Sequence, residues 1–585
     1  MIEMNNPYLS LLKTVWHYGL PWRRTIIGFY LAFILAQVCI SFSPYAFGRT
    51  IDVLQHFEEH KLTEVIFWLS VGVLVLLLFW LFHGPARVIE RKVALKIQQA
   101  YRLNIYQQLT HLPLKWHQDH HSGNIISRLN RASTALHRFA ENQFIYVESI
   151  VKFLTSIGFL IWISPTVGLI SFFTSLLIGC TVVWFDRRLI PLYDAQNEIE
   201  NHVGAVLFDY ISNMTTVLTL RLGELTHSNL FQRLMKIWPF FRKDVVINEV
   251  KWFTMMMLLS AIQAAILMGY ILYTLNTTSA IMIGVVVMLF RYQWDLGTVF
   301  HDLSIHYSEL VRTETDVKGM QPILEDIKRL AHLPQGASTA RDWHQLRIEH
   351  LRFHHVGSEV RGHIFKELNF TIKRGEKIAL IGSSGGGKST LLNLLCGLYT
   401  ASRVQLTIDE VVFDSLEPLQ TITTLIPQDP EIFENTIAFN ITMDLPVEKD
   451  EIYQSVNLAA FMPVLATLPF GLDTDIREKG LNFSVGQKQR LALARGLFAA
   501  RFSSLILMDE PTSSVDLPTE KEILSGVIKA FPDAALVVSL HRLHLLPKFD
   551  RVIMLNQGEI VADGPTAVLL QQPGPVRELW EHYQQ

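Results

Sequence analysis

The chain has 585 residues, of which 49% are hydrophobic and 18% are charged, and its formal net charge is −3. This length allows two or more folding units, because a single core rarely grows past roughly 250–300 residues. The charge balance argues against a nucleic-acid partner, which normally requires a strong basic excess. Cys39, Cys180 and Cys396 show neither a disulfide framework nor metal-ligand spacing, so we interpret them as apolar filler.

Nearly all long apolar runs lie before residue 300, so we expect a membrane half followed by a soluble half. Six stretches are long enough to cross a hydrocarbon layer of about 30 Å as helices. They lie near residues 25–46, 64–84, 143–163, 166–185, 253–275 and 279–299. The first twenty residues lack the compact apolar core of a signal peptide. The expected domains are an amphipathic lead-in helix (1–20), a membrane domain (21–330), a linker (331–344) and a soluble domain (345–585).

Basic residues concentrate in the two long connections of the membrane half, residues 85–142 and 186–252. By the positive-inside tendency these connections and both termini are expected in the cytoplasm. The segment 87–112 keeps helical periodicity without Gly or Pro, so the spans should continue as helices beyond the membrane. Turns are expected near 113–122 and 207–215, where short crosswise helices could transmit movement. Simple connections between helices are the alternative.

Ionisable residues inside the apolar stretches allow two interpretations. Arg291 and Asp295 lie in the sixth stretch, where a charge is costly unless it faces protein or water. They could line a polar substrate pathway, or they could form an i,i+4 pair that neutralises itself. Glu148 and Lys152 in the third stretch are interpreted as a self-paired couple near the cytoplasmic edge. The pathway would also include Gln263 and Trp294.

From about residue 345 the pattern changes to alternating strands and helices. KIALIG (377–382) predicts a buried strand, and LLNLLCGL (391–398) predicts a helix. The SSGGGKST between them completes the phosphate-binding pattern G-x-x-x-x-G-K-[ST] in its required context. Backbone N–H groups of such a loop wrap phosphates, while its Lys reaches the outer phosphates and its Ser binds Mg²⁺. The predicted ATP-binding residues are Gly382, Ser383, Ser384, Gly385, Gly386, Gly387, Lys388, Ser389 and Thr390.

LILMDE (505–510) predicts a buried strand that ends in two adjacent carboxylates. We expect Asp509 to face a Mg²⁺ ion and Glu510 to face an attacking water. A helix N-cap pair within a loop is the alternative interpretation. The residues that follow, PTSSVD (511–516), disfavour that alternative.

Together these segments resemble the nucleotide-binding domain of ABC transporters. The resemblance is carried by IGSSGGGKST (381–390), Gln428 in LIPQDP, FSVGQKQRLALARG (483–496), LILMDEPTSSVD (505–516) and His541 in VVSLHRL. The six expected spans with long cytoplasmic extensions are similar to the exporter-type membrane domain of the same family. The implied fold class is an all-α six-helix transmembrane domain followed by an α/β P-loop NTPase domain of the ABC type.

The resemblance implies a role for each motif. Gln428 would bind Mg²⁺ and sense the membrane half, Glu510 would act as the general base, and His541 would contact the γ-phosphate. Asp516 would touch a second, facing domain, and Glu478 would lie in the loop that touches the crosswise helices. A signature loop would complete the ATP site of the facing domain. This loop consists of Phe483, Ser484, Val485, Gly486 and Gln487.

The sequence departs from the family pattern at two important positions. His355 stands where an aromatic ring usually stacks on adenine, with Phe353 as the fallback. Val485 stands where Gly is commoner, and a β-branched residue is costly if that position needs a positive φ. Ser484 remains suited to cap the helix that follows it and to form an anion site with N–H groups near Gly486.

The resemblance implies ATP-driven export or flipping of an unidentified substrate, with ATP and Mg²⁺ as cofactors. The aromatic and Met-rich fifth and sixth stretches suit an amphipathic substrate, and ordinary span filler is the alternative interpretation of these residues. Each chain carries only one half of each of two ATP sites, so a homodimer is expected. A related half-transporter is the alternative partner. The expected location is the cell inner (plasma) membrane, with the chain spanning the lipid bilayer several times and both termini and the ATPase domain in the cytoplasm. The alternative functions are an importer on the same frame and an ATP-gated channel or regulatory membrane protein.

Overall fold

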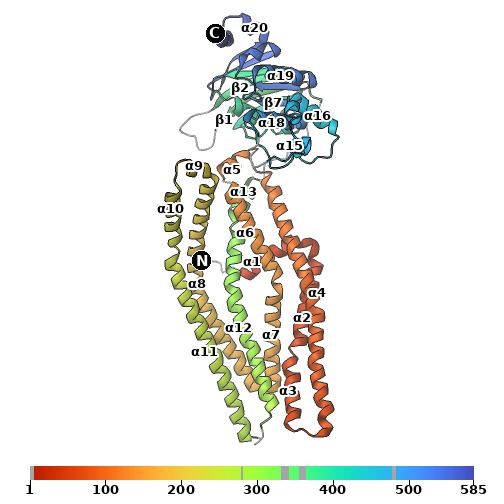
Figure 1. Cartoon of the computed structure of the whole chain (residues 1–585), viewed down its shortest axis with the longest axis vertical. Coiled ribbons are helices and arrows are strands. Elements are labelled where there is room, and N and C mark those ends of the chain that lie inside the picture. Colours follow the sequence, from red (N-terminus) through yellow and green to blue (C-terminus); the bar gives the residue numbers. More distant parts are fainter. Residues whose placement is uncertain are drawn as a thin grey trace. The chain divides into compact units, whose positions relative to one another are not determined.

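The computed structural model describes residues 6–120, 122–277, 281–330, 342–354, 364–476 and 483–584. The chain divides into two compact units (Figure 1). The first contains Met1–Leu112 and His117–Ala331, and the second contains Pro113–Trp116 and His332–Gln585. Each unit has its own architecture and is described by itself.

The described residues before 331 form helices. These are α1 (Pro7–Tyr18), α2 (Arg23–Ile40), α3 (Ser43–Gln55), α4 (Leu62–Leu109), α5 (Leu114–Asp119), α6 (Ser122–Glu141), α7 (Gln143–Ile163), α8 (Pro165–Ser212), α9 (Met214–Thr219), α10 (Gly223–Met235), α11 (Trp238–Thr277), α12 (Ile283–Lys318) and α13 (Gln321–Leu330). Helices α4 and α8 have 48 residues each. At 1.5 Å per residue such a helix extends about 72 Å, more than twice the thickness of the hydrocarbon layer.

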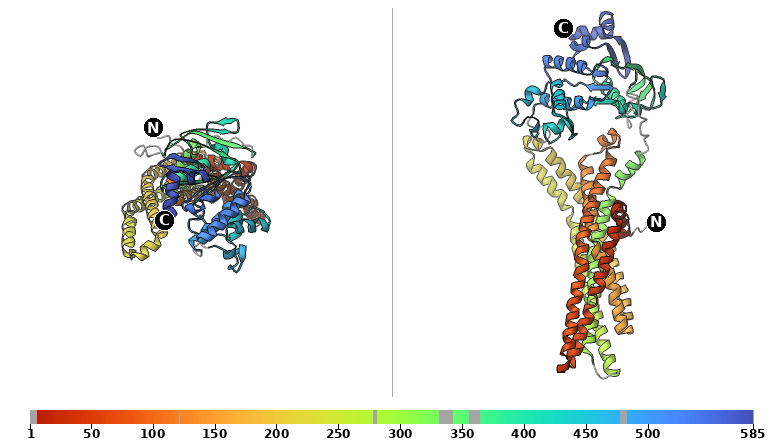
Figure 2. Two further views of the ribbon diagram at one scale, coloured as in Figure 1. Left: turned by 90° about the horizontal axis from the view of Figure 1, so that it is seen from above. Right: turned by 90° about the vertical axis from the view of Figure 1, so that its right-hand side faces the viewer.

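Five helical segments in the described part of the chain are long and apolar enough to cross a membrane, one fewer than predicted. They are Leu20–Gln55, Glu59–Leu109, Ser122–Ile163, Pro165–Ser212 and Gly223–Thr277. The sixth predicted stretch falls in α12, whose mean hydropathy is lowered by Arg291, Gln293 and Asp295. Helix α12 packs against α3, α6 and α7 within the bundle (Figures 1 and 2). Helix α12 is therefore less apolar than these five segments.

The first predicted stretch, residues 25–46, forms part of two helices, α2 and α3, rather than one continuous helix. Pro44 lacks the N–H group that a continuous helix would use. The Ser41 hydroxyl donates to the carbonyl of Gln37 at 2.7 Å, within the break. The Tyr292 hydroxyl of α12 donates to the carbonyl of Ser41 at 3.0 Å. The break therefore presents a backbone acceptor to the neighbouring helix.

The long connections contain helices, as their periodicity predicts. Helix α5 lies within the first predicted turn, whereas most of the second, 207–215, belongs to α8, and α9 begins only at Met214. At the end that carries α9, the pair formed by α8 and α10 diverges from α6 and α12 (Figures 1 and 2). The membrane unit is therefore forked at this end.

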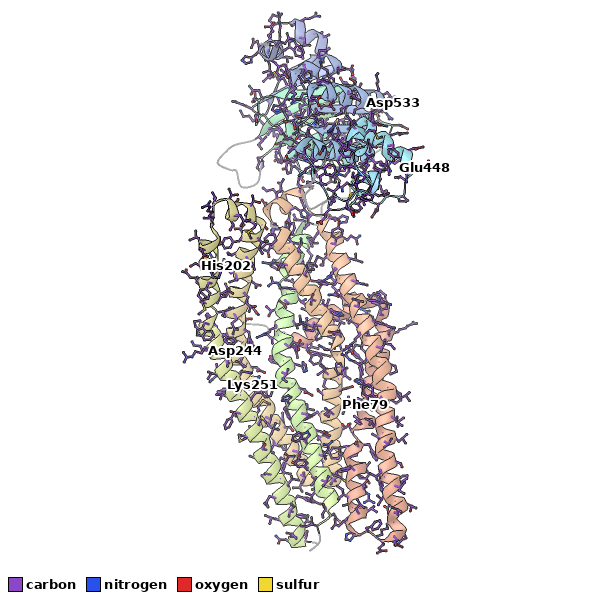
Figure 3. The ribbon with its side chains drawn as sticks, in the orientation of Figure 1. Phe79, His202, Asp244, Lys251, Glu448 and Asp533 are labelled. Carbon is purple, nitrogen blue, oxygen red and sulfur yellow. The ribbon has the colours of Figure 1, made fainter. Side chains whose placement is uncertain are left out.

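The predicted self-pairing of Glu148 with Lys152 is corrected by the structure. Oε1 of Glu148 on α7 lies 2.6 Å from Nδ1 of His83 on α4. The His83 ring stacks on Phe79, with centroids 4.8 Å apart (Phe79 is labelled in Figure 3). Sequence spacing could not reveal this partner, because it comes from another helix. The Glu148 carboxylate thus joins two helices of the bundle.

A buried ion pair joins α8 to α11. Nζ of Lys251 lies 2.8 Å from Oδ1 of Asp186, and the two side chains are 2% and 1% exposed (Lys251 is labelled in Figure 3). Within the described residues, Oδ2 of Asp186 has no hydrogen-bond partner. Taking two charges out of water is costly, and each charge is tolerated only because the other is present.

We expect Asp186→Ala to destabilise the protein by about 3–5 kcal/mol, because it leaves Lys251 buried without a counter-ion. The double variant Asp186→Leu with Lys251→Leu should recover much of this loss, since no buried charge remains. Thermal unfolding followed by tryptophan fluorescence measures both effects. Glu249→Ala, at an exposed position of α11, is the control. Equal losses in the single and double variants would show that the charge balance does not matter.

The second unit contains two sheets. The six-stranded sheet has the order β10-β9-β3-β8-β7-β6, in which only β10 is antiparallel to its neighbour. The four-stranded sheet has the antiparallel order β2-β1-β4-β5. The strands are β1 (Gln345–Phe353), β2 (Phe365–Lys373), β3 (Lys377–Gly382), β4 (Arg403–Ile408), β5 (Val411–Phe413), β6 (Thr423–Ile426), β7 (Leu505–Asp509), β8 (Ala535–Ser539), β9 (Arg551–Asn556) and β10 (Glu559–Pro565).

The described residues of this unit also form α-helices. They are α14 (Lys388–Leu395), α15 (Ile437–Thr442), α16 (Lys449–Leu458), α17 (Met462–Leu465), α18 (Val485–Ala500), α19 (Leu517–Ala530), α20 (Thr566–Gln571) and α21 (Pro575–Gln584). Strands β7 and β8 are buried along their whole length, as apolar runs of parallel strands predict. Alternate residues point to two cores: Ile506 and Met508 pack with α18 and α19, while Leu505 and Leu507 pack with α14 and the smaller sheet. The loops at the carboxyl ends of these strands are therefore rigidly supported.

Candidate functional site

Four parallel strands end at one edge of the six-stranded sheet. Strand β6 is followed by Gln428, β7 ends at Asp509, β8 is followed by His541, and β3 runs into the loop before Lys388. Ligands of open parallel sheets bind at the carboxyl ends of the strands, where the connecting loops converge. The topology thus gathers predicted site residues from segments far apart in the sequence.

Residues 383–387 turn the chain from β3 into α14. Gly382, Gly385 and Gly387 have φ values of 144°, 79° and 103°, which residues with a Cβ rarely adopt. A Cβ at Gly382 would also collide with the carbonyl of Leu555 on β9. Helix α14 begins without a side-chain cap. Its first N–H groups therefore point outward and can bind an anion.

The Lys388 ammonium group folds back over this loop. Its Nζ donates to the carbonyls of Gly382 at 3.0 Å and Ser383 at 3.2 Å. Burial lowers the pKa of Lys388, while the nearby carboxylates of Glu510 and Asp509 act in the opposite direction. A phosphate group would offer this ammonium a charged acceptor in place of neutral carbonyls, which makes a stronger hydrogen bond.

Glu510 is held from two sides. Its Oε1 lies 2.6 Å from Nε2 of His541, and Nε2 of Gln428 donates to its Oε2 at 2.8 Å. The Glu510 backbone has a φ of 47°, in the left-handed region that non-glycine residues seldom adopt. Such strain persists only where surrounding structure fixes the backbone, and it is common at functional sites. Two of the residues predicted to be catalytic, Gln428 and His541, therefore both contact the third, Glu510.

Asp509 has the features of a cation ligand. Its side chain is buried, and in the part of the chain that the structure describes its Oδ1 has no hydrogen-bond partner. A buried unpaired carboxylate oxygen is costly unless a cation neutralises it. No cluster of three or more His, Cys, Asp or Glu side chains occurs among the described residues. This donor set fits Mg²⁺, which uses one or two protein carboxylates and completes its shell with phosphates and water.

Ser484 caps α18 by a reciprocal pair of hydrogen bonds. The Gln487 amide N–H donates to Ser484 Oγ at 3.3 Å, and the Ser484 N–H donates to Gln487 Oε1 at 2.9 Å. Phe483 is buried beside Phe461 in the core. Val485 is the first residue of α18 and is absent from the described residues with positive φ. The β-branched side chain is therefore unstrained here, and its 63% exposure places it on the surface.

Gln489 is a site residue that the sequence analysis missed. Its Nε2 donates to the carbonyl of Glu510 at 3.2 Å and to Ser513 Oγ at 2.9 Å. Its Oε1 accepts from the N–H of Ser514 at 2.8 Å. The available signal was a polar residue on the apolar face of α18, four residues before the buried Leu493. Gln489 thus links α18 by hydrogen bonds to the loop that carries Glu510.

We expect Gln489→Leu to lower ATP turnover about tenfold with little change in ATP affinity, because the loop after Glu510 loses three hydrogen bonds. Steady-state hydrolysis and binding of a fluorescent ATP analogue separate the two effects. Gln454→Leu, at an exposed position of α16, is the matched control. Unchanged turnover in Gln489→Leu would mean that these bonds do not position Glu510.

The loop after Glu510 is also fixed to α19. Oδ2 of Asp516 accepts from the Thr519 N–H at 3.2 Å and from its hydroxyl at 3.1 Å, and these bonds lower the pKa of Asp516. Arg542 donates to the carbonyl of Val515 at 2.6 Å and to Glu520 Oε2 at 3.1 Å. Asp516 is therefore an exposed helix cap at the end of an ordered loop.

Two predicted residues, His355 and Glu478, lie outside the described residues. The fallback for adenine stacking, Phe353, is 5% exposed and stacks on Tyr399 with ring centroids 5.6 Å apart. Its ring is part of the domain core. The structure thus favours a packing role for Phe353.

The four predicted pathway residues separate into two pairs. Gln263 and Trp294 line one cavity of the membrane unit, whereas Arg291 and Asp295 do not line it. Nε2 of Gln263 donates to the carbonyl of Phe290 at 3.2 Å. Asp295 lies within the electrostatic reach of Lys152 and Arg291 without a side-chain hydrogen bond to either. The structure thus shows no bonded i,i+4 pair at these two described residues.

Two family models match the chain. The model for the ABC transporter transmembrane region matches residues 26–294, and the ABC transporter model matches residues 365–513. The chain belongs to the ABC transporter family. Its one membrane domain joined to one nucleotide-binding domain is the architecture of a half-transporter. This ABC transporter chain is a multi-pass membrane protein, and its second unit is an ATP-binding and ATP-hydrolysing domain.

Relatives of this ABC transporter extend the likeness over most of the chain. Heavy metal tolerance factor 1 of Caenorhabditis elegans is 26% identical over 493 residues, which cover 82% of this chain but only 60% of the relative. The ATM1-type heavy metal exporter of Novosphingobium aromaticivorans is 23% identical over 570 residues, 95% of this chain and 92% of the relative. The structure of a bacterial Atm1-family ABC exporter with ATP bound has a TM-score of 0.80 at 20% identity, over 96% of this chain and 99% of that one. This chain therefore has the ABC exporter fold.

Proposed function

We propose that this half-transporter exports or flips an amphipathic molecule across the cell inner (plasma) membrane, by alternating access coupled to ATP hydrolysis. The observation that supports this most is the contact of Gln428 and His541 with Glu510, beside the phosphate loop. The exporter named among the relatives supports the outward direction, and heavy metal is the cargo of that relative. The basic connections of the membrane half support cytoplasmic termini and a cytoplasmic ATPase domain.

In the proposed mechanism, Lys388 and the first N–H groups of α14 bind the outer phosphates of ATP. The γ-phosphate offers His541 an acceptor, so His541 can leave Glu510 and free one oxygen of that carboxylate. Glu510 then takes a proton from the attacking water as general base, while Gln428 holds its other oxygen. The strained backbone of Glu510 keeps the carboxylate in place between cycles.

A Mg²⁺ ion would be held by Asp509, Ser389 and Gln428. The unpaired buried oxygen of Asp509 supports this assignment. When bound, the ion neutralises charge on the phosphates of ATP.

We propose that the working unit is a homodimer. The signature loop and the phosphate loop lie at different helix N-termini of one domain, so each can serve a site shared with a second copy. Val485 and Asp516 are exposed, as side chains at such an interface would be in a single copy. Apolar side chains are also exposed on α9 and α10, beyond the apolar stretches, and such patches on a water-facing segment indicate a partner. These side chains include Leu218, Leu225 and Phe231.

Transport direction tests the proposed function. In proteoliposomes, external ATP drives only those molecules whose ATPase domain faces outward. An exporter should then move a fluorescent amphipath from a panel of lipid and dye probes into the lumen, and Glu510→Gln should not. ATP-driven loss of the probe from the lumen would identify an importer. Ion conductance that persists in Glu510→Gln would identify a channel.

A further inference from the structure

A cavity of about 380 Å³ lies among α8, α11 and α12 in the membrane unit. This volume lies within the range of small-molecule sites, which is roughly 300–1,000 Å³. Polar and aromatic side chains from all three helices line it. They include Ser171 on α8, Gln263 on α11, and Gln293, Trp294 and His301 on α12.

Gln293 is buried in the wall of this cavity without a partner. Its side chain is 8% exposed, and neither its Nε2 nor its Oε1 has a hydrogen-bond partner in the described residues. Ser171, which is 2% exposed, likewise has an Oγ without a partner there. Unpaired polar groups are costly within a membrane protein, where bulk water does not satisfy them. Two unpaired polar side chains in one cavity wall therefore indicate that a bound molecule satisfies them.

The charge of the lining residues limits which kinds of molecule can bind in the cavity. The described lining residues include no Asp, Glu, Lys, Arg or Cys, and His301 is the only titratable side chain among them. An ionised group placed here would lack a counter-ion, which is expensive at membrane depth. Iron–sulfur clusters are held by Cys thiolates, which the described lining of this cavity does not include, and Met256 supplies its one thioether. The chemistry therefore favours an uncharged polar group.

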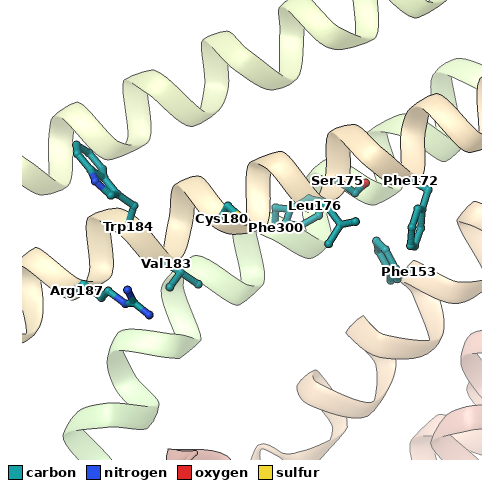
Figure 4. A pocket seen from close by; sticks show the side chains of 10 residues that line it. Phe153, Phe172, Ser175, Leu176, Cys180, Val183, Trp184, Arg187 and Phe300 are labelled. Carbon is teal, nitrogen blue, oxygen red and sulfur yellow. The ribbon is translucent and has the colours of Figure 1, made fainter. Parts of the chain in front are cut away.

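A neighbouring cavity of about 610 Å³ has a different character. Figure 4 shows Arg187 at one end of it and Phe153 and Phe172 at the other. The rest of its described wall is apolar except for Ser175, the thiol of Cys180 and the indole N–H of Trp184. Ser175 and Phe300 line both cavities, so the polar cavity adjoins an apolar one. This arrangement suits a molecule with a polar head and an apolar body.

We propose that the cavity among α8, α11 and α12 binds the uncharged amide-bearing head of an amphipathic molecule, with the Gln293 carboxamide as its anchor. Nε2 of Gln293 donates to the carbonyl oxygen of that head, and Oε1 accepts from its N–H group. Such a pair satisfies both unpaired atoms of Gln293 at once. The inference rests on the proposed function in one respect, because it assigns the bound molecule as the exported cargo.

Photolabelling tests this proposal without nucleotide. The probes are dodecanamide and dodecanesulfonate, each carrying a diazirine at the end of its chain, and the protein is held in lipid nanodiscs. We expect the diazirine at the chain end of the amide probe to label α7, α8 and α12 around the adjoining apolar cavity, and unlabelled dodecanamide should compete at least about tenfold better than dodecanesulfonate. Gln293→Leu should reduce this preference about fivefold, because the amide loses its hydrogen-bond partner while the sulfonate still lacks a counter-ion. Gln293→Lys should reverse it, because the new ammonium pairs with the sulfonate.

Gln37→Leu is the matched control, because it removes a buried glutamine of α2 that does not line the cavity. It should leave the labelling unchanged. Equal labelling by both probes, labelling spread over lipid-facing helices, or an unchanged preference in both Gln293 variants would overturn the proposal. Because labelling needs no ATP, failure of the proposed function can be told apart from failure of this inference. If only the proposed function fails, ATP-driven transport is absent while the Gln293-dependent labelling remains.

Discussion

Lys388→Ala is expected to lower ATP turnover by about 10²–10³-fold, because the outer phosphates lose a buried cation aimed at them. The wild-type ammonium is held over the phosphate loop by two carbonyl acceptors, so it is positioned before ATP arrives. Alanine also keeps the helix propensity of α14, which limits the effect on folding. Steady-state hydrolysis by the chain alone in lipid nanodiscs measures the loss.

The control for this substitution is Lys366→Ala, which removes an exposed lysine on β2 that lies 3.6 Å from Glu559. Exposed ion pairs contribute little, so turnover should stay unchanged in this variant. Thermal unfolding of both variants checks that the fold is intact. Near-normal hydrolysis by Lys388→Ala would refute the assignment of the phosphate loop.

Glu510→Gln is expected to keep ATP binding and to lose turnover by about 10²–10⁴-fold, because an amide cannot take the proton of the attacking water. Gln is nearly isosteric with Glu, so it should still contact Gln428 and fit the same strained backbone. Bound ATP should therefore accumulate. Binding of radiolabelled ATP, measured beside hydrolysis, separates the two properties.

Glu522→Gln changes an exposed carboxylate of α19 in the same way and serves as the control. It should bind and hydrolyse ATP as the wild type does. If Glu510→Gln loses ATP binding together with turnover, Glu510 supports the nucleotide site rather than acting on water. If it hydrolyses ATP normally, another group is the base.

The nucleotide site was largely predictable because its motifs must follow particular strands. The apolar strand before Asp509 and the glycines before Lys388 each carry a local signal, and the sheet order then brings their ends together. Gln428 and His541 carry no such signal alone, and only the family pattern singled them out. Their contacts with Glu510 follow from the parallel order of β6, β7 and β8.

The remaining features depend on partners that sequence spacing does not identify. The His83 partner of Glu148 comes from another helix, so periodicity could not predict it. In the sequence, Gln489 looks like an ordinary polar residue of a helix. Only its contacts with the loop that begins at Glu510 show its role. The polar cavity likewise combines residues of three helices. The sequence predicts Gln263 and Trp294 as pathway residues, but it carries no signal for Gln293.

The central claim is that two copies of this chain form ATP sites shared between them. To test this directly, heterodimers are purified through two different tags and their ATP hydrolysis is measured. Pairing a Lys388→Ala chain with a Ser484→Ala chain leaves one intact shared site, whereas pairing wild type with the double variant leaves none. The account predicts that the first heterodimer hydrolyses ATP at least about tenfold faster than the second. The reverse order would show that each chain completes its own site and would contradict the account.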